Sequence, residues 1–492
     1  MLSKAQQIKN SFVYLIPVVV GNLIPIITLP FFTRALSKED YGALALSQAY
    51  ALFATGLANF GLVTGYERNF FEYTDELRAS QLLYSTLLFV MFALTFCGLI
   101  TFVFKSPLSR LIVGSDIHRE LFFWTFCSTA MMGLKNYFLI YLKNAGNAKA
   151  HVWCTIYETL IGTIVALTLV LYYNVGVIGL TLGQLLGSST VFVLLCRRFM
   201  RSHTPSLSWP ILKDSLKLSY PLTPKVFLGV IGSQFDKYMI GLLATIGGVG
   251  VYAIGQKVAW VVFAGMTAMQ NVFSPQVYKR MFEMGGKGGA EIGRYLTPFA
   301  YVSTFLALCV SLFSEEMIIL LTPPPFHEAV DIIMVLCVLY ASMFFGKQPQ
   351  LIYAKKTFVT SMYSTLNIVL NIAINIPFIS RWGAAGAAWG TLLCGIATGA
   401  VSFALSQHYY RIEWEYLKLL FIYALFLGFL LLVLVSRHMG VPYPFLLGIK
   451  FIGFASYLLL GAWLKIIRPS DLRYTLSLFS RRDRESIEQS AE

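Results

Sequence analysis

Ionisable side chains interrupt some of the most apolar segments of this sequence. Residues 218–243, LSYPLTPKVFLGVIGSQFDKYMIGLL, carry Lys225, Asp236 and Lys237. Lys225 and Asp236 lie eleven positions apart. This spacing is close to three helical turns, so we expect both on one face of a helix, about 16 Å apart along its axis. Charge within a bilayer is costly and usually faces a cavity or a partner, which predicts a charged stripe that lines a lumen. For Asp236 and Lys237, snorkelling to the outer interface stays an alternative.

Three further charged residues fall within neighbouring apolar segments. Lys257 is expected at a depth close to that of Asp236, where the two side chains would form a structural or a gating pair. Lys135 and Glu158 each lie about eight residues from the cytoplasmic end of adjacent, antiparallel segments, which predicts a second pair. Glu158 would then be either a fixed counter-ion or a group that carries a proton.

Cations outnumber anions among the charges well inside these segments. The charges there are three lysines, Lys135, Lys225 and Lys257, and only two acidic residues, Glu158 and Asp236. A cavity lined in this way would attract an anion, and lysine binds phosphate as a point charge. The pattern predicts a substrate with a phosphate or pyrophosphate group.

An uncharged polar stripe follows in STLNIVLNIAIN. It places Ser364, Asn367, Asn371 and Asn375 three and four residues apart, on one helical face. Asparagine can bind sugar hydroxyls, and it also joins helices within membranes. Both interpretations stay open for Asn367 and Asn371. The seven cysteines and six histidines show no metal-ligand spacing, so we expect no metal and no cofactor, other than coupling to protons or sodium.

The amino-acid composition indicates which kind of secondary structure carries these residues. The chain has 492 residues, of which 57% are hydrophobic and 13% charged, and its mean hydropathy is +0.67. A soluble chain is nearer 25% charged. We therefore predict an all-α integral membrane protein with about fourteen spans. The predicted spans are 11–33, 41–64, 82–104, 121–142, 150–173, 176–197, 217–240, 248–271, 296–321, 329–352, 358–379, 384–407, 415–436 and 441–465.

The positions of the charges orient these spans. If the N-terminus is cytoplasmic, most of the 38 Lys and Arg residues fall in cytoplasmic loops and tails. This asymmetry is the positive-inside rule, and it predicts that both termini are cytoplasmic. The net charge of +14 then reflects topology, and we expect no nucleic-acid partner.

Two motifs recur at nearly one offset. YGALALSQ at 41–48 parallels VGVYAIGQ at 249–256, and VGVIGLTLG at 175–183 parallels WGAAGAAWG at 382–390. The period covers six spans, so the halves should be related by an axis along the membrane normal. We predict two six-helix lobes, 1–210 and 211–410, then an additional helix pair, 411–467, and a cytoplasmic tail, 468–492. Two lobes around a cavity are typical of transporters, and the absence of a large loop argues against an enzyme.

Several of these stretches resemble a known family. LPFFTRALSKEDYGALALSQ, YPLTPKVFLGVIGSQFDKYMIGLL, GVGVYAIGQKVAW and RWGAAGAAWGTLL are similar, in order and spacing, to the polysaccharide transporter (Wzx-type) flippases. These belong to the multidrug/oligosaccharidyl-lipid/polysaccharide exporter superfamily. The resemblance covers about 1–410 and continues through the additional helix pair.

The resemblance implies a function. Members of this family pass undecaprenyl-pyrophosphate-linked oligosaccharides across the bacterial inner membrane by alternating access, for O-antigen, capsule or exopolysaccharide assembly. It implies basic cavity residues that hold the pyrophosphate, and here the candidates are Lys225, Lys257, Lys135 and Lys237. It also implies ion coupling or gating, for which Asp236 and Glu158 are the candidates. The implied partners are the lipid-linked oligosaccharide, membrane lipid and the polysaccharide polymerase machinery.

Three other functions stay open. One is a purely structural or assembly membrane protein, against which the repeated lobes and the charges within the spans argue. A multidrug exporter of the same superfamily would favour an acidic cavity for cationic drugs, whereas the lysines favour an anion. A membrane glycosyltransferase or polymerase would need a large outer loop or a cluster of loop carboxylates or arginines. The sequence contains neither of these features.

Overall fold

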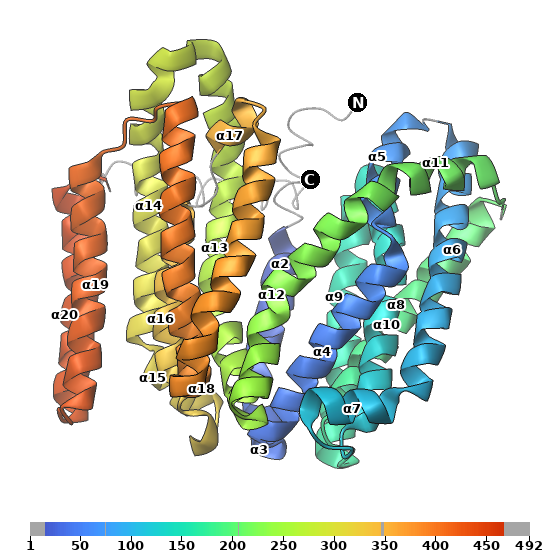
Figure 1. Ribbon diagram of the computed structural model, residues 1–492, viewed down its shortest axis with the longest axis horizontal. Helices are drawn as coiled ribbons and strands as arrows, with labels where there is room; N and C mark the ends of the chain where they lie inside the picture. Colours follow the sequence, from blue (N-terminus) through green and yellow to red (C-terminus); the bar gives the residue numbers. More distant parts are fainter. Residues whose placement is uncertain (1–14, 74, 205, 346–348, 467–492) are drawn as a thin grey trace, which may run out of the picture. The chain divides into compact units, whose positions relative to one another are not determined.

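The structure is a computed structural model that describes residues 15–73, 75–204, 206–345 and 349–466 (Figure 1). Within these ranges the secondary structure is helical and no strand occurs. The chain forms two compact units. Unit 1 contains Met1–Gly255, Met317–Ala329 and Ile372–Gly390, and unit 2 contains Gln256–Glu316, Val330–Asn371 and Thr391–Glu492. The predicted tail, 468–492, lies outside the described residues.

Unit 1 holds the first helices of the chain. These are α2 (Leu15–Ile27), α3 (Leu29–Ala35), α4 (Lys38–Asn59), α5 (Leu62–Glu72), α6 (Glu76–Val103), α7 (Lys105–Val113), α8 (Arg119–Asn144), α9 (Ala148–Leu167), the π-helix η1 (Thr168–Tyr172), α10 (Ile178–Ser202), α11 (Trp209–Ser219), the 3₁₀ helix η2 (Tyr220–Leu222) and α12 (Thr223–Leu243). The start of α13, the end of α15, the 3₁₀ helix η4 (Pro324–Phe326) and the middle of α18 also belong to unit 1.

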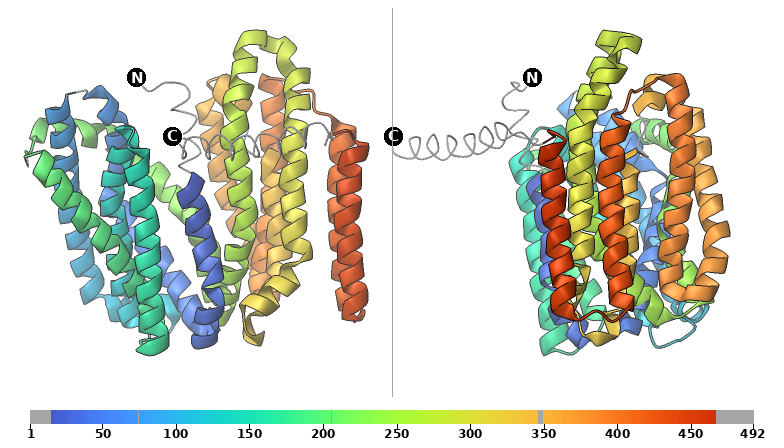
Figure 2. Two further views of the ribbon diagram at one scale, coloured as in Figure 1. Left: turned by 180° about the vertical axis from the view of Figure 1, so that it is seen from behind. Right: turned by 90° about the vertical axis from the view of Figure 1, so that its left-hand side faces the viewer.

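Unit 2 holds most of the remaining helices. These are α13 (Ile246–Met284), η3 (Gly285–Gly288), α14 (Gly289–Leu312), α15 (Ser314–Leu321), α16 (Ala329–Ser342), η5 (Met343–Phe345), α17 (Pro349–Tyr353), α18 (Thr357–Tyr409), α19 (Tyr416–His438) and α20 (Tyr443–Trp463). Helices α13 and α14 run antiparallel, and the 3₁₀ helix η3 joins them (Figure 2).

Many of these helices are long and apolar enough to cross a bilayer. In the described part of the chain eight segments meet this criterion, and the bent pair of α4 and α5 makes nine. Two of the eight, Ile246–Leu312 and Val359–Tyr409, each contain two helices joined by a turn. The prediction of an all-α, multi-pass membrane protein is confirmed. Each predicted span overlaps a helix, whereas the exact count of fourteen stays a prediction.

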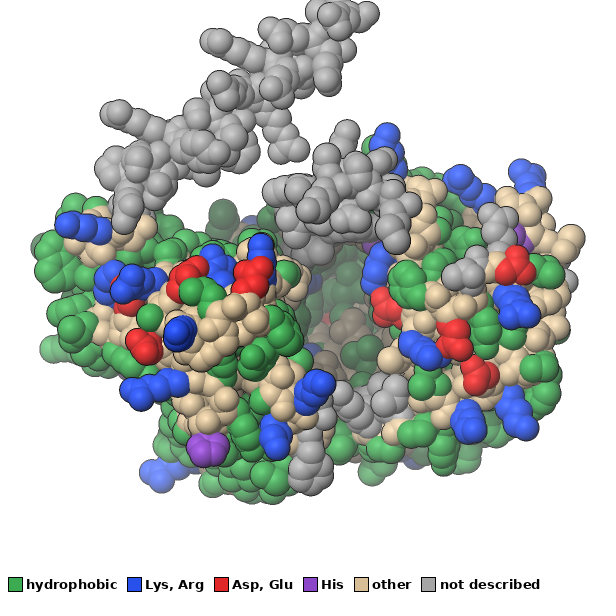
Figure 3. Space-filling model, turned by 90° about the horizontal axis from the view of Figure 1, so that it is seen from above, with side chains coloured by type: hydrophobic (Ala, Val, Ile, Leu, Met, Phe, Trp, Pro, Cys, Tyr) green, Lys and Arg blue, Asp and Glu red, His purple; other side chains and the backbone are tan. Residues whose placement is uncertain are grey.

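Basic side chains gather at one end of unit 1. The end that holds α5 and α11 is the one that Figure 3 views, and α3 and α7 lie at the opposite end (Figure 1). An uneven distribution of this kind is what the positive-inside rule predicts, and the assignment of the cytoplasmic end stays a prediction. The residues at that end include Lys143, Lys149, Arg197, Arg198, Arg201, Lys213 and Lys217.

The motif SKEDYG sets the start of α4. The Ser37 hydroxyl accepts a hydrogen bond from the Asp40 backbone N–H at 3.1 Å, and the Asp40 carboxylate accepts one from the Ser37 N–H at 3.0 Å. This capping box satisfies two donors that a helix start would otherwise leave unpaired. At the other end Phe60 and Gly61 adopt positive φ, of 50° and 68°, and this turn separates α4 from α5.

The glycine motif WGAAGAAWG folds α18 back on itself. Gly383 adopts φ 56° and ψ −134°, and this non-helical residue divides α18 into two helices. A Cβ atom on Gly386 would collide with the Phe378 carbonyl, and one on Gly390 would collide with the Asn375 side chain. The motif therefore provides both the turn and the close packing of the two halves.

The matching motif VGVIGLTLG builds a similar hairpin between η1 and α10. Gly176 adopts φ +72°. A Cβ atom on Gly179 would lie 2.8 Å from the Val170 side chain, and one on Gly183 would lie 2.5 Å from the Gly162 carbonyl oxygen. The first glycine of each motif therefore turns the chain, and the next two allow a close approach to the preceding helix.

The other repeated motif supplies a helix crossing. A Cβ atom on Gly42 of α4 would collide with the Ile246 carbonyl, and one on Gly250 of α13 would collide with the Lys38 carbonyl. Gly42 and Gly250 occupy matching positions of the repeat. Each repeat therefore contributes its own glycine to one crossing, at which the two backbones touch.

Substitution of these glycines should show which of them the packing requires. We expect Gly183→Ala to destabilise the protein by about 1–3 kcal/mol, because its methyl group has no room between α9 and α10. Gly133→Ala on α8 is the matched control, because a Cβ atom there meets nothing within 4 Å. Alanine also favours a helix over glycine by up to about 1 kcal/mol, so the control should be neutral or stabilising. Thermal unfolding in detergent measures both variants, and equal midpoints would contradict this account.

Candidate functional site

A buried polar cluster surrounds Asp236 inside unit 1. Asp236 on α12 accepts a hydrogen bond from the Tyr252 hydroxyl of α13 at 3.2 Å and another from the Asn375 amide of α18 at 3.0 Å. Asp236 is 9% exposed, Tyr252 1% and Asn375 fully buried. We call these three residues the Asp236 cluster. Asp236 therefore does not snorkel, because protein groups hold its carboxylate inside the unit.

Glycines give the Asp236 cluster its shape. Gly390 is the position at which a Cβ atom would collide with the Asn375 amide oxygen. The turn at Gly383 brings Gly390 to this place, beside the helix half that carries Asn375. The chain thus uses one glycine motif to fold α18 and to make room for the side chain that binds Asp236.

The four candidate lysines have different surroundings. Lys135 is buried in an ion pair. Lys237 is partly buried and donates to the Gln234 amide oxygen at 2.9 Å. Lys257 on α13 is exposed and makes no ion pair within the described residues of unit 2. Lys225 lies on α12, and its side chain is outside the described part of the structure.

The predicted pair of Lys135 and Glu158 is confirmed. The Lys135 ammonium group on α8 binds the Glu158 carboxylate on α9, and the Ser188 hydroxyl of α10 donates to the other carboxylate oxygen at 2.6 Å. The two charged side chains are only 6% and 13% exposed. Three helices of unit 1 therefore meet at one neutralised pair of charges.

The asparagine stripe faces the second half of α18. The Asn367 amide oxygen accepts from the Thr398 hydroxyl at 2.8 Å, and the Asn371 amide donates to the Thr391 hydroxyl at 3.3 Å. Asn375 continues the stripe into the Asp236 cluster. These contacts give Asn367 and Asn371 a role in packing the hairpin, and a contact of either residue with substrate stays a prediction.

One buried cation has partners that the sequence does not indicate. Lys450 of α20 is fully buried and binds Glu316 at 2.6 Å and Glu315 at 3.3 Å. Arg437, at the end of α19, binds Asp331 at 2.7 Å beside them. The sequence offered candidates, because Glu315, Glu316 and Asp331 lie near the ends of predicted spans, but it did not indicate which of them Lys450 would bind.

The arrangement can carry charge but offers no metal centre of the usual kind. Among the residues that the structure describes, no group of three or more His, Cys, Asp or Glu side chains is placed to hold a metal ion. The Asp236 cluster instead presents one carboxylate with two neutral hydrogen-bond donors. Such a carboxylate can carry a proton or accept a cation, and both are typical of coupling sites in transporters.

The sequence also matches a family of known proteins. The family described as "Polysaccharide biosynthesis protein" matches residues 8–275, which is more than half of the 492 residues. The chain belongs to this family. The matched region includes both copies of the first repeated motif, as well as Asp236 and Tyr252 of the cluster. A comparison with curated proteins gives no match.

Solved structures show the fold that this family member shares. The lipid II flippase MurJ in an inward closed conformation is similar with a TM-score of 0.72 at 16% identity, over 93% of this chain and 98% of that one. An inward-facing multidrug resistance MATE family transporter of the MOP superfamily is similar with a TM-score of 0.67 at 14% identity, over 81% of this chain and 97% of that one. A MOP superfamily transporter from Pyrococcus furiosus is similar with a TM-score of 0.55 at 12% identity, over 82% of this chain and 95% of that one. These likenesses confirm the fold predicted from the family resemblance.

Single and paired substitutions should distinguish an ion pair that only stabilises the structure from one that takes part in transport. We expect Lys135→Met alone and Glu158→Met alone each to destabilise unit 1 by about 3–5 kcal/mol, because each leaves one buried charge without its partner. The double substitution should recover most of the loss, because two apolar side chains of similar size fill the site. Thermal unfolding measures stability, and flux through the reconstituted protein measures activity.

The flux of the double variant decides the role of Glu158. Recovered stability with full transport would assign the pair to structure, and recovered stability without transport would assign Glu158 to coupling. A double variant as unstable as the single ones would contradict the proposed balance of buried charge.

Proposed function

We propose that this protein is a flippase that moves an undecaprenyl-pyrophosphate-linked oligosaccharide across the bacterial inner membrane. The family match over residues 8–275 is the observation that carries the proposal, because it links the chain to polysaccharide biosynthesis. The fold shared with MurJ, whose name describes it as a lipid II flippase, supports transport of a lipid-linked substrate. The proposal includes cytoplasmic termini and transfer toward the outer leaflet.

The basic residues inside the spans support an anionic substrate. Lys257 is exposed and makes no ion pair within the described part of unit 2, and the partner of Lys237 is a neutral amide. Lys135, in contrast, is already neutralised by Glu158, so its positive charge is not available to a pyrophosphate. We therefore place the pyrophosphate contacts at Lys257, Lys237 and Lys225, and assign Lys135 to the packing of unit 1.

In this proposal the Asp236 cluster couples transport to an ion gradient. Its carboxylate lies next in sequence to Lys237, on the helix that also carries Lys225. Binding of a proton or a sodium ion would change the charge beside those lysines, and hence their attraction for pyrophosphate. Alternating access would then follow from the different affinity of each conformation for the ion and the substrate.

A cation-coupled multidrug exporter is the second candidate, and the likeness to the MATE fold is the observation that favours it. The excess of lysines opposes it, since cationic drugs would be repelled. A glycosyltransferase or polymerase is a weaker candidate, because the family and the similar solved structures point to transport. The proposal also includes association of this protein with polysaccharide polymerase machinery.

The lysines provide a test in proteoliposomes loaded with undecaprenyl-pyrophosphate-linked oligosaccharide. We expect Lys225→Ala and Lys257→Ala each to lower the translocation rate at least tenfold, since a charge-assisted contact is worth about 1.5–3 kcal/mol. Lys279→Ala is the matched control, because Lys279 is a surface residue 63% exposed and should be dispensable. All three variants should fold and reconstitute normally. Normal translocation in both span variants would contradict the pyrophosphate contacts.

A further inference from the structure

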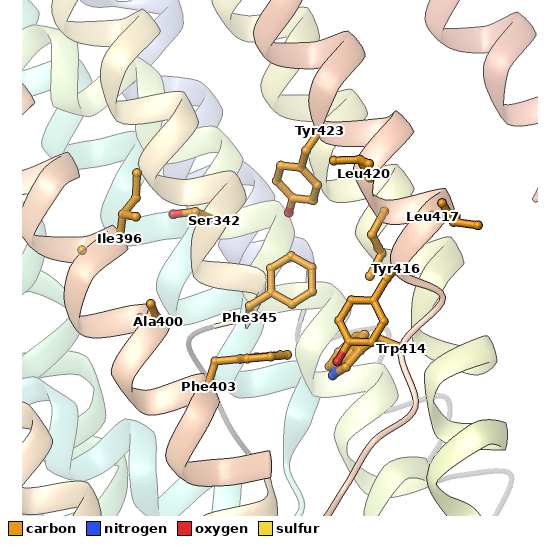
Figure 4. A pocket seen from close by; sticks show the side chains of 13 residues that line it. Ser342, Phe345, Ile396, Ala400, Phe403, Trp414, Tyr416, Leu417, Leu420 and Tyr423 are labelled. Carbon is orange, nitrogen blue, oxygen red and sulfur yellow. The ribbon is translucent and has the colours of Figure 1, made fainter. Parts of the chain in front are cut away.

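Unit 2 contains two cavities that differ in chemistry. The larger is a groove of about 610 Å³ between the end of α16, the second half of α18 and the start of α19, and mainly apolar side chains line it (Figure 4). The smaller, of about 260 Å³, is lined by residues of α13, α17 and both halves of α18, and most of them carry a hydroxyl or an amide group. None of the described residues that line it is charged. We call this smaller space the polar cavity.

One wall of the polar cavity is a polar face of α13. Gln270, Ser274 and Tyr278 line the cavity and follow one another at four-residue spacing, so they share one face of the helix. All three are partly buried, and their side chains make no hydrogen bond within the described residues. The Tyr278 ring packs against the hydrophobic core of unit 2, which holds it in place. This face therefore offers donors and acceptors that the protein itself does not use.

The two halves of α18 supply further polar groups. Thr360, Tyr363 and Ser364 come from the first half, at three- and four-residue spacing, and the Ser364 hydroxyl donates to the Thr360 carbonyl at 2.9 Å. Ser402 comes from the second half and is only 3% exposed, yet its hydroxyl has no hydrogen-bond partner within the described residues. Buried hydroxyls are usually hydrogen-bonded. A buried, unpaired hydroxyl at the wall of a polar cavity therefore indicates that the cavity holds a hydrogen-bonding ligand.

The lining groups match a sugar ring. Hydroxyl and amide groups both donate and accept hydrogen bonds, as the hydroxyls of a sugar do. The rings of Tyr278 and Tyr363 combine an apolar face with a polar edge, which suits the C–H face of a sugar. The volume is slightly below the range of about 300–1,000 Å³ that is typical of pockets for drug-sized ligands, so it suits a single ring. The lack of a charged lining residue argues against a phosphate, which is usually bound by Lys or Arg.

We propose that the polar cavity binds one sugar ring of the glycan on the transported lipid. This inference rests on the proposed flippase function and adds the place at which unit 2 recognises the glycan. Gln270 of α13 and Ser402 of α18 bind hydroxyls of the ring, and a tyrosine ring covers its apolar face. Gln270 follows Lys257, a proposed pyrophosphate contact, by thirteen residues, which is about 20 Å along α13. The bound ring is therefore not the sugar attached to the pyrophosphate.

Four substitutions in the full-length protein test the polar cavity. Gln270→Leu removes the amide and keeps a side chain of similar size. Gln276→Leu is its matched control, because Gln276 lies on the same helix, is exposed and does not line the cavity. Ser402→Ala removes the unpaired hydroxyl. Ser406→Ala is its matched control, because the Ser406 hydroxyl is also buried and unpaired but does not line the cavity.

Binding to the protein in lipid nanodiscs is measured with two probes. One is undecaprenyl-pyrophosphate-linked oligosaccharide extracted from cells that produce this protein, and the other is undecaprenyl pyrophosphate without a glycan. We expect Gln270→Leu and Ser402→Ala each to weaken binding of the first probe about two- to tenfold, because each removes one neutral hydrogen bond. Binding of the second probe should not change, because it has no sugar to enter the cavity. Both controls should bind each probe as the unmodified protein does.

Two results would overturn the glycan site. One is binding of the oligosaccharide probe that neither cavity variant weakens. The other is equal weakening for both probes, which would assign the cavity to the pyrophosphate or to its lipid carrier. Both results leave the flippase proposal intact, because the unmodified protein still binds its substrate. Failure of the unmodified protein to bind either probe would instead contradict the flippase proposal, and the glycan site with it.

Discussion

The cost of an unpaired charge in apolar surroundings is the constraint on which this structure depends. The buried cations of unit 1 and unit 2, Lys135 and Lys450, each bind acidic residues of another helix. Asp236 lies in the same kind of environment but is held by neutral donors. The difference matters, because an ion pair between two helices fixes a structure, whereas a carboxylate held by hydrogen bonds can still take up a proton. In the proposed function, this contrast separates the residues that pack the helices from the residue that couples transport to an ion gradient.

Small residues place these charges where they can meet. The glycine motifs at 175–183 and 382–390 turn the chain and allow the adjoining helices to approach closely. One motif packs α9 against α10 near the pair of Lys135 and Glu158, and the other forms the pocket for Asn375. In membranes, helix association has little hydrophobic driving force, so close packing and polar contacts provide the specificity. The repeat thus supplies two similar helix hairpins, and each positions a different set of polar side chains.

The sequence predicted those parts of this arrangement that depend on contacts between neighbouring segments or on the periodicity of apolar residues. Helix positions follow from apolar runs. The pair of Lys135 and Glu158 follows from equal depth in adjacent spans. The partners of Asp236 could not be predicted, because Tyr252 and Asn375 reach it from helices whose approach depends on the fold. Lys450 was missed for a similar reason, since its partners lie 134 and 135 residues away. Charged residues at equal depth in the membrane are candidate partners, whereas the choice among them depends on how the helices pack.

The leaflet distribution of the lipid-linked oligosaccharide, in cells with and without this protein, tests the central claim most directly. A membrane-impermeant glycan-modifying probe labels only the glycolipid that has reached the outer leaflet. Without the protein, we expect the glycolipid to accumulate on the cytoplasmic side and surface polysaccharide to disappear. Re-expression should reverse the accumulation and restore the surface polysaccharide. Normal labelling in the absence of the protein would contradict the flippase function, and drug export would become the leading interpretation.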